Sequence, residues 1–248
     1  MNRWLKMGVG TLGVGLLLIG PTAAHAQEIS LSLGGDGSIS ARSIQLILLI
    51  TVLSLAPGLA IMITCFPFLV TVLAILRQAI GLQQSPPNMM IVSLALFLTY
   101  FVMEPVFTAA WQNGISPLIE ESIDVETAMT RSIDPFRGFM AARVDANTYR
   151  AMAELRPDPQ GLEPSPEAPL SVLVPSFLLS EISRAFQIGF LVFLPFLIID
   201  LVVAAILMSM GMMMVPPAIV SLPFKLAFFV VADGWSLVAS ALVRSYYP

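Results

Sequence analysis

Residues 193–217 read FLPFLIIDLVVAAILMSMGMMMVPP, and this stretch decides the fold class. Its first part carries one charge, Asp200, in a run long enough to cross a bilayer, which takes about 20 apolar residues in a helix. Pro216 and Pro217 then end that helix, because proline cannot continue helical hydrogen bonding and restricts the residue before it. Since a second apolar run follows at once, we expect a tight helical hairpin with its turn near Met214. The chain is predicted to be all-α and membrane-associated.

The composition of the 248-residue chain agrees with that prediction. Residues of the AVILMFWYC set make up 57% and charged residues 11%, whereas a soluble domain carries about 25% charged residues. The formal net charge is -4, and no basic cluster stands out. Because nucleic-acid binding needs lysines and arginines that neutralise phosphates, nucleic acid is excluded as a partner.

Apolar blocks dominate the sequence. The first is longer than one crossing requires and is interrupted by Pro57-Gly58 and Pro67, so we expect it to bend, tilt or extend beyond the lipid. A turn-rich connection, GLQQSPPN from Gly81, follows it. The blocks are Ile44–Leu76, Met89–Trp111, Ile188–Met214 and Val215–Val243, and they predict about four long helices arranged as hairpins.

The N-terminal residues have the three parts of a secretory signal peptide. Two basic residues precede an apolar stretch, Met7–Ile19, that is too short to span about 30 Å of hydrocarbon. Ala24 and Ala26 then form an A-x-A cleavage site. We therefore expect residues 1–26 to be a cleaved signal peptide and 27–43 a flexible Gly/Ser-rich arm outside the cytoplasm. The alternative is a retained first membrane helix.

A polar segment separates the second and third blocks. Gln112–Pro169 holds 10 acidic and 5 basic residues, a local net charge of -5. Within it, Ile115–Leu155 has helical apolar spacing, and Pro157–Pro169 holds five prolines and is typical of an extended loop. The predicted regions are a first helical hairpin region at 44–111, an acidic, partly helical extracytoplasmic segment at 112–187 and a second hairpin with a Met-rich turn at 188–248.

Charged residues in the apolar blocks need partners, because each is costly when unpaired in lipid. At about 1.5 Å per residue, Asp200 and Lys225 lie roughly 21 and 17 Å from the hairpin turn, so they are expected to pair within the hairpin or between subunits. Asp233, deeper, is expected near Glu181 and Arg184, which also suit an i, i+3 pair. Structural, subunit-locking pairs are favoured over a proton path.

Five methionines crowd the hairpin turn. Methionine is unbranched and polarizable, so it packs around varied shapes, and apolar constrictions close pores to ions by dewetting. The residues are Met208, Met210, Met212, Met213 and Met214, and the hypothesis is that a ring of such loops forms a pore gasket. The alternative is that they merely fill an apolar turn.

Two further segments are more particular than generic membrane helix. They are PSFLLSEISRAFQIGF, from Pro175, and PFKLAFFVVADGW, from Pro223. With the stretch at 193–217 they resemble the FliP family, the P component of the flagellar type III export gate, and its injectisome relatives. The likeness is close over Ile188–Arg244 and looser over Ile44–Trp111. One departure is Ser176, where the family pattern suggests alanine.

The resemblance implies a channel-forming subunit rather than an enzyme. It implies a ring of copies of this chain, a pentamer by family expectation, together with the Q and R components and larger membrane subunits of the apparatus. Unfolded secreted proteins pass through the middle. The expected location is the bacterial inner membrane at the flagellar basal body, with a periplasmic segment. A leader and a long acidic segment favour flagellar over injectisome service.

Other function classes fit less well. The only cysteine is Cys65 and the only histidine is His25, in the leader, so histidine-dependent catalysis, thiolate metal sites and cofactors are not expected. An intramembrane aspartyl protease would use Asp200 and Asp233 as a carboxylate pair, but their expected depths differ and no protease motif surrounds them. A small-solute transporter would be expected to show internal repeats, and none is evident.

Overall fold

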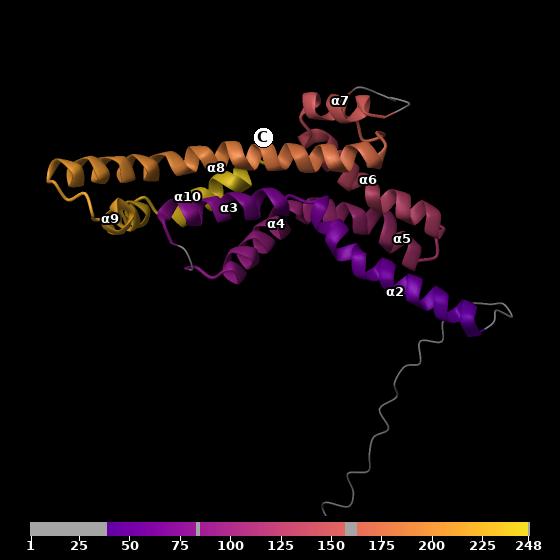
Figure 1. Ribbon diagram of the computed structural model, residues 1–248. Coiled ribbons are helices and arrows are strands. Elements are labelled where there is room, and N and C mark those ends of the chain that lie inside the picture. Colours follow the sequence, from indigo (N-terminus) through magenta and orange to yellow (C-terminus); the bar gives the residue numbers. More distant parts are fainter. Residues whose placement is uncertain (1–38, 83–84, 157–162, 248) are drawn as a thin grey trace, which may run out of the picture. The chain divides into compact units, whose positions relative to one another are not determined.

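The computed structural model describes residues 39–82, 85–156 and 163–247 (Figure 1). All regular elements in this part of the chain are helices, which confirms the predicted all-α class. Contacts divide the chain into two units, residues 1–49 and 50–248, and the packing described below belongs to the second. The helices are α2 (Ile39–Met62), α3 (Phe66–Ile80), α4 (Asn88–Ala110), the π-helix η1 (Trp111–Ile115), α5 (Ser116–Ile119), α6 (Val125–Arg143), α7 (Ala146–Glu154), α8 (Leu170–Ser209), α9 (Pro217–Val231) and α10 (Gly234–Arg244).

Several of these helices suit a bilayer. In the described part, three stretches are long and apolar enough to cross: Ser43–Met62 in α2, Asn88–Ile119 from α4 to α5, and all of α8. The α9–α10 pair makes a fourth if its two helices, bent by 61°, are counted as one broken span. The prediction of a membrane-associated helical chain is confirmed.

The first apolar block is two helices rather than one. Helix α2 continues through Pro57-Gly58, and the chain turns instead at Ile63–Cys65. Pro67 lies in the first turn of α3, where a missing N–H loses no helical hydrogen bond. The block Ile44–Leu76 therefore bends, as expected, beside Pro67, which begins a new helix, whereas the expected interruption at Pro57-Gly58 is wrong.

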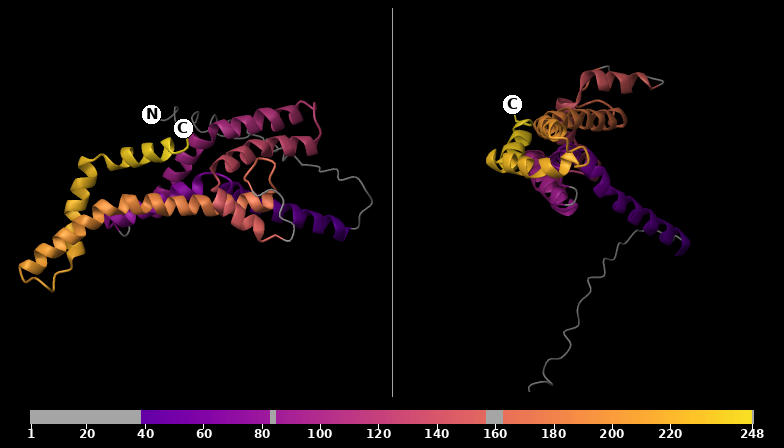
Figure 2. Two further views of the ribbon diagram at one scale, coloured as in Figure 1. Left: turned by 90° about the horizontal axis from the view of Figure 1, so that it is seen from above. Right: turned by 60° about the vertical axis from the view of Figure 1, so that its left-hand side comes forward.

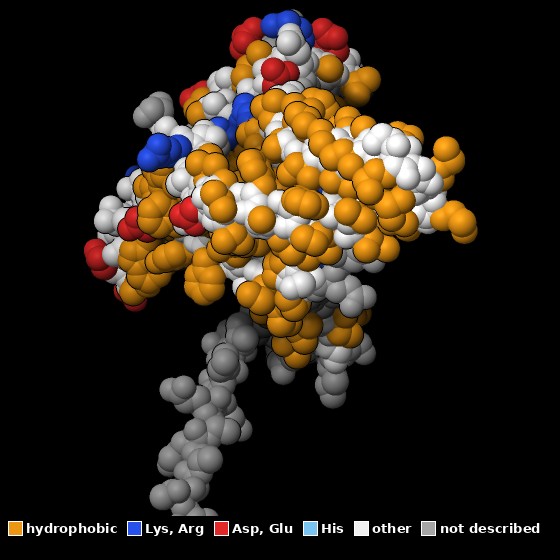
Figure 3. All heavy atoms as spheres, turned by 90° about the vertical axis from the view of Figure 1, so that its left-hand side faces the viewer, with side chains coloured by type: hydrophobic (Ala, Val, Ile, Leu, Met, Phe, Trp, Pro, Cys, Tyr) orange, Lys and Arg blue, Asp and Glu red, His pale blue; other side chains and the backbone are white. Residues whose placement is uncertain are grey.

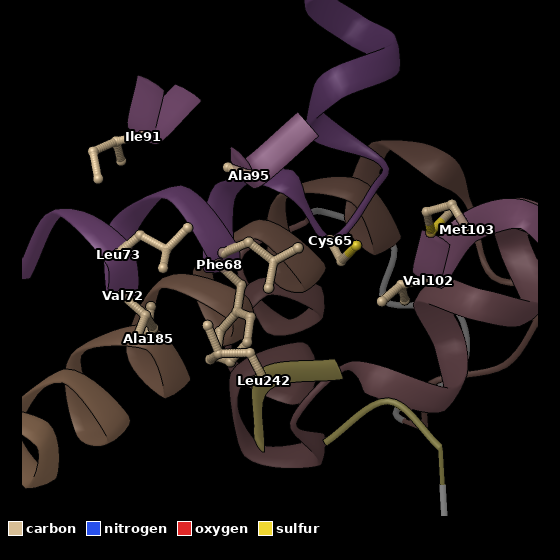
Figure 4. Close-up of a cluster of buried hydrophobic side chains, with 11 residues drawn as sticks. Cys65, Phe68, Val72, Leu73, Ile91, Ala95, Val102, Met103, Ala185 and Leu242 are labelled. Atoms are coloured by element: carbon tan, nitrogen blue, oxygen red, sulfur yellow. The ribbon is translucent and has the colours of Figure 1, made fainter. Parts of the chain in front are cut away.

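Helix α3 lies at the centre of the core. Its 15 residues include seven buried ones, and Phe68, Val72 and Leu73 are fully buried against α4, α8 and α10 (Figure 4). Ala185 of α8 and Leu242 of α10 close the cluster. Because α3 is apolar on nearly all sides and packed on nearly all sides, it acts as a core helix rather than a lipid-facing span.

The segment that sequence spacing predicts as helical, Ile115–Leu155, holds three helices separated by turns. Asp124 ends the break before α6 by accepting the N–H of Thr127, and Asp145 caps α7 by accepting the N–H of Thr148. These hydrogen bonds hold the pKa values of both carboxyls below their usual range. Each cap satisfies an N–H group that the first turn of a helix leaves free.

Helix α8 is a single element of 40 residues. It begins at Leu170, directly after the Pro-rich stretch, part of which (157–162) lies outside the described residues. The expected boundary between 187 and 188 therefore falls inside one helix. The first half of α8 packs against α6 and α7, where Tyr149, Leu173 and Phe177 are buried together.

Helices α8 and α9 form the expected hairpin, and α10 departs from it. Antiparallel packing places Phe229 of α9 against Phe196 of α8, with ring centroids 6.3 Å apart. The block expected as one helix, Val215–Val243, breaks at Asp233, which has a left-handed φ of 47°. Figure 2 shows the sharp bend between α9 and α10. The last block is thus two helices, and after the break α10 packs against α3 and α4.

Candidate functional site

The five predicted gasket methionines all lie exposed at the tip of the α8–α9 hairpin. Helix α8 ends at Ser209, and Gly211 turns the chain with a positive φ of 77°, a conformation that glycine adopts without strain. The turn is tied to the helix because the Met212 N–H donates to the Leu207 carbonyl. Exposed fractions are 62% for Met208, 66% for Met210, 41% for Met212, 84% for Met213 and 97% for Met214.

An apolar groove of about 480 Å³ runs beside this tip. Met210 and Met212 line it, together with Ile206 of α8 and Val220 and Phe224 of α9. The surface over this end of the molecule is largely hydrophobic (Figure 3). The methionine loop therefore continues an apolar surface that has no partner within the described chain.

Below the tip, Asp200 and Lys225 are brought together. The Lys225 ammonium lies 2.6 Å from one Asp200 carboxylate oxygen and donates to the Ala79 carbonyl at 3.2 Å. The Ser221 hydroxyl donates to the other Asp200 oxygen at 2.5 Å. Lys225 is 6% exposed. This group joins α8, α9 and the end of α3, and so fixes the hairpin that carries the methionine loop.

A second ion-pair group surrounds Glu181, which is fully buried. Arg143 and Arg184 share one carboxylate oxygen, each with a nitrogen 3.1 Å away. The Tyr246 hydroxyl donates to the other oxygen, and the Arg143 guanidinium stacks on the Tyr246 ring with 4.0 Å to the centroid. Arg143 also donates to the Ser245 carbonyl. The group therefore joins α6 and α8 to the residues that follow α10.

Arg143 and Tyr246 are members of this group that the sequence did not indicate. Arg143 belongs to a polar segment and Tyr246 follows the last helix, so neither stands in an apolar block. A usable signal is that Glu181 lies among apolar residues, because a buried carboxylate needs several donors. Burial, followed by the Glu181 carboxylate, raises the pKa of the Tyr246 phenol well above its ordinary value, so the hydroxyl stays a proton donor.

Asp233 does not join either group. It is exposed, and within the described residues it forms no ion pair. The expectation that Asp233 lies buried near Glu181 and Arg184 is corrected: the break between α9 and α10 falls at this residue and turns it outward. The expected cleavage site, Ala24 and Ala26, lies outside the described residues.

Among the described residues, no group of three or more His, Cys, Asp or Glu side chains is arranged to hold a metal ion. Cys65 is buried, and burial raises the pKa of its thiol to about 12, which keeps it protonated and unreactive. What the geometry offers is an apolar loop on a hairpin braced by buried charges.

Comparisons with known proteins agree with the resemblance seen in the motifs. The family model described as "FliP family" matches residues 49–242. The flagellar biosynthetic protein FliP of Caulobacter vibrioides is 50% identical over 91% of this chain and 85% of its own length. The proteins of the same name are 45% identical in Agrobacterium fabrum, over 94% of this chain and 97% of theirs, and 43% identical in Bacillus subtilis, over 82% and 92%. The chain therefore belongs to the FliP family.

Proposed function

We propose that this chain is a channel-forming subunit of the flagellar type III protein export gate. Copies of it assemble into a ring through which unfolded flagellar proteins cross the bacterial inner membrane, and the methionine loops meet as a gasket. That the chain is a non-enzymatic component of flagellar export follows from its membership of the FliP family of flagellar biosynthetic proteins. The observation that supports the channel and its gasket is the exposed methionine loop at the tip of a hairpin that the Asp200–Lys225 pair holds together.

The exposed apolar surface supports assembly with other subunits. Large apolar side chains stand exposed on α4 and along the second half of α8, among them Phe97, Tyr100, Leu201 and Ile206. Contiguous apolar surface of this kind indicates lipid or protein contacts. The proposed partners are further copies of this chain, a pentamer by family expectation, the Q and R components and the larger membrane subunits of the apparatus.

The loop has the chemistry that a gasket requires. Between Leu207 and Lys225 the hairpin carries no charged residue, so a ring of such loops presents mainly methionine side chains, with the small hydroxyl of Ser209, to the pore. Water and ions leave an apolar constriction readily, and the flexible thioethers repack around any passing side chain. The Asp200–Lys225 group keeps the base of each loop fixed while the tip adapts.

The proposed orientation of the chain in the membrane follows from the expected signal peptide. With residues 1–26 exported and cleaved, the charged α5–α7 segment lies in the periplasm and the α3–α4 connection at the cytoplasmic side. The charged side chains of the described segment 112–156 suit water on that side. The protein is therefore placed in the inner membrane at the flagellar basal body.

The alternatives carry less support. An injectisome role is disfavoured because the relatives reported above are all flagellar. An aspartyl protease needs two facing carboxylates, but Asp200 is held by Lys225 and Ser221 while Asp233 points outward. No observation favours a small-solute transporter.

Site-specific photo-crosslinking tests the proposal. A photoreactive residue at Met213, in cells exporting a flagellar substrate fused to a tightly folded domain that stalls in the gate, should crosslink to that substrate. The same residue at Met129 of α6, which is also exposed (68%), serves as the matched control and should not. Native mass spectrometry of the purified complex should show several copies of the chain. Equal crosslinking at both positions, or a single copy per complex, would overturn the proposal.

A further inference from the structure

The ion-pair groups around Asp200 and Glu181 leave some charged side chains on the apolar helices unaccounted for. Such charges are costly unless another molecule pairs with them. Among the described residues of the second unit, those on α3, α4, α9 and α10 that form no ion pair are Arg77, Glu104, Asp233 and Arg244. Two of these four, Arg77 and Asp233, are hydrogen-bonded to residues that line one cavity.

Arg77, in the last turn of α3, is a cation with unused donors. One of its terminal nitrogens donates to the Pro86 carbonyl at 3.3 Å and to the Asn88 side chain. Its Nε atom is buried and has no hydrogen-bond partner. A guanidinium offers five N–H donors that match a carboxylate in a fork. Arg77 therefore retains the capacity to bind an acid, and none of the described residues supplies one.

Asp233 is the opposite case, an acid that its own helix does not use. It occupies the N-cap position of α10, yet its side chain accepts no capping hydrogen bond, although aspartate commonly does so there. The backbone at Gly234 packs closely on the Phe229 ring, since a Cβ on Gly234 would come within 2.1 Å of that ring. This packing fixes the corner between α9 and α10. Val231, two residues before Asp233, is 87% exposed. The corner thus presents an exposed acid and an exposed apolar side chain close together in the sequence.

Neither Arg77 nor Asp233 lines the apolar cavity of about 550 Å³ between them, but each is hydrogen-bonded to a residue that does. Pro86, the acceptor of Arg77, lines one side, and Val230, whose carbonyl accepts the Asp233 N–H, lines another. Ile80, Met90, Phe229 and Trp235 contribute further walls. The chain therefore offers a cation that is hydrogen-bonded to the wall of an apolar hollow and, separately, an acid two residues after an exposed valine.

We propose that, in the ring, Asp233 of one copy binds Arg77 of the adjacent copy, with Val231 of the first copy against the apolar hollow beside that arginine. The contact is heterologous, which is the kind that closes identical subunits into a ring. It rests on the proposed function, since it requires that copies assemble side by side.

The positions of the two residues along α8 fit such a ring. Arg77 lies on α3 between Ile75, which touches Gly189 of α8, and Ile80, which packs with Phe196. Asp233 lies one turn beyond Phe229, which also packs on Phe196, in the direction of Gly189 because α9 runs antiparallel to α8. Both charges therefore occupy the same stretch of α8. If the ring axis runs along α8, as this proposal requires, each residue keeps one level in every copy and these two can meet.

Mixed expression of two charge-reversed copies tests the contact. Arg77→Glu alone and Asp233→Lys alone each place like charges together, so the fraction of chain found in the ring by native mass spectrometry should fall about tenfold or more. Co-expressed with different tags, the two variants should regain much of the lost assembly, because alternation in a ring of five leaves one like-charged contact where either variant alone has five. In a mixed contact, residue 77 of either copy meets a residue 233 of opposite charge.

The controls separate the possible outcomes. Arg150→Glu reverses a charge in the exposed Arg150–Glu163 pair of α7 and should leave the ring fraction unchanged. The double variant on one chain should also assemble, which shows that both substitutions permit folding. If the double variant assembles but the mixture does not, the two residues pair within one chain and the proposal is wrong. Unaffected single variants, or a double variant that fails to assemble, would also contradict it. A wild-type chain that forms no ring would instead refute the proposed function.

Discussion

At the scale of single residues, the hydroxyl of Tyr246 is the least replaceable donor in the Glu181 group. It is the donor to one of the two carboxylate oxygens, and Glu181 is fully buried. Tyr246→Phe should lower the free energy of unfolding by about 1–3 kcal/mol, because a buried acceptor loses its hydrogen bond. Denaturant unfolding of the detergent-solubilised protein measures this.

Tyr247→Phe is the matched control for that substitution. The Tyr247 hydroxyl donates to backbone carbonyls of α4 at 3.3 and 3.4 Å and lies in a partly exposed place, so its loss should change the unfolding free energy by less than about 1 kcal/mol. Equal effects of the two substitutions would mean that the Glu181 group does not depend on the Tyr246 hydroxyl.

Positions calculated from the helical rise per residue correctly predict contacts between residues of one hairpin. They do not predict contacts between residues of separate segments. Asp200 and Lys225 lie on adjacent helices joined by a short turn, so helical rise alone predicts their proximity. Arg143 lies 38 residues before Glu181 on a different helix, and only the packing of α6 on α8 brings them together. The same arithmetic is wrong for Asp233 because α9 ends at Val231 and the chain turns before α10.

At the scale of elements, the packing of η1 against α6 depends on Gly114. A Cβ there would lie 2.0 Å from the Ser132 hydroxyl and 2.7 Å from the Ala128 carbonyl, and the backbone oxygen cannot rotate away. Gly114→Ala should destabilise the protein by about 1–3 kcal/mol through overpacking. Gly138→Ala, inside α6 with open space around it, should stabilise by about 0.4–1 kcal/mol. Thermal unfolding that gives the same sign for both would refute this interpretation.

The caps of α6 and α7 make these two helices sensitive to acid. The pKa values of Asp124 and Asp145 are lowered in the folded chain by hydrogen bonds from Thr127 and Thr148. Their stabilisation is therefore present above the unfolded carboxyl pKa of about 3.9 and is lost as the pH falls through the lowered folded-state values. Amide exchange at residues 126, 127 and 148, corrected for its intrinsic pH dependence, should report weaker protection at low pH.

Asparagine at both cap positions is the control for that acid sensitivity. Asn caps helices about as well as Asp but does not titrate, so Asp124→Asn with Asp145→Asn should make the protection of these amides independent of pH in this range. Protection that still falls with pH in this variant would assign the sensitivity to other groups.

Prolines show why element boundaries are the part of the fold least predictable from sequence. Pro57 and Pro195 lie within helices, whereas Pro67 and Pro217 begin them. The local restriction on the backbone is the same in each case. What differs is the tertiary packing that holds the flanking turns, and a single sequence does not contain it. The apolar blocks and the α8–α9 turn were predictable because composition and a proline pair specify them together.

At the scale of the whole molecule, the second unit buries the ion-paired Glu181 and Lys225 and leaves much of its apolar surface exposed. Glu181 is fully buried and Lys225 nearly so, while Phe97, Leu201 and Met214 stand exposed. A water-soluble domain has the reverse arrangement. The buried charges therefore hold the helices of this unit together, and the apolar faces remain available to lipid and to the partners proposed above.

The methionine loop provides the prediction that bears most directly on the whole assembly. Replacing Met212, Met213 and Met214 together by alanine removes the long side chains but keeps Gly211 and the proline pair that shape the turn. Because the loop side chains are exposed and the Asp200–Lys225 group is untouched, the ring should still form. Its apolar constriction becomes wider, so ions should leak. Cells making the variant should be salt-sensitive and reconstituted complexes should conduct, while export of flagellar proteins continues in part. The control variant Met89→Ala with Met129→Ala changes two exposed methionines outside the loop. It should cause neither salt sensitivity nor conductance. A triple variant that conducts no more than the wild type would mean that the methionines only fill the turn.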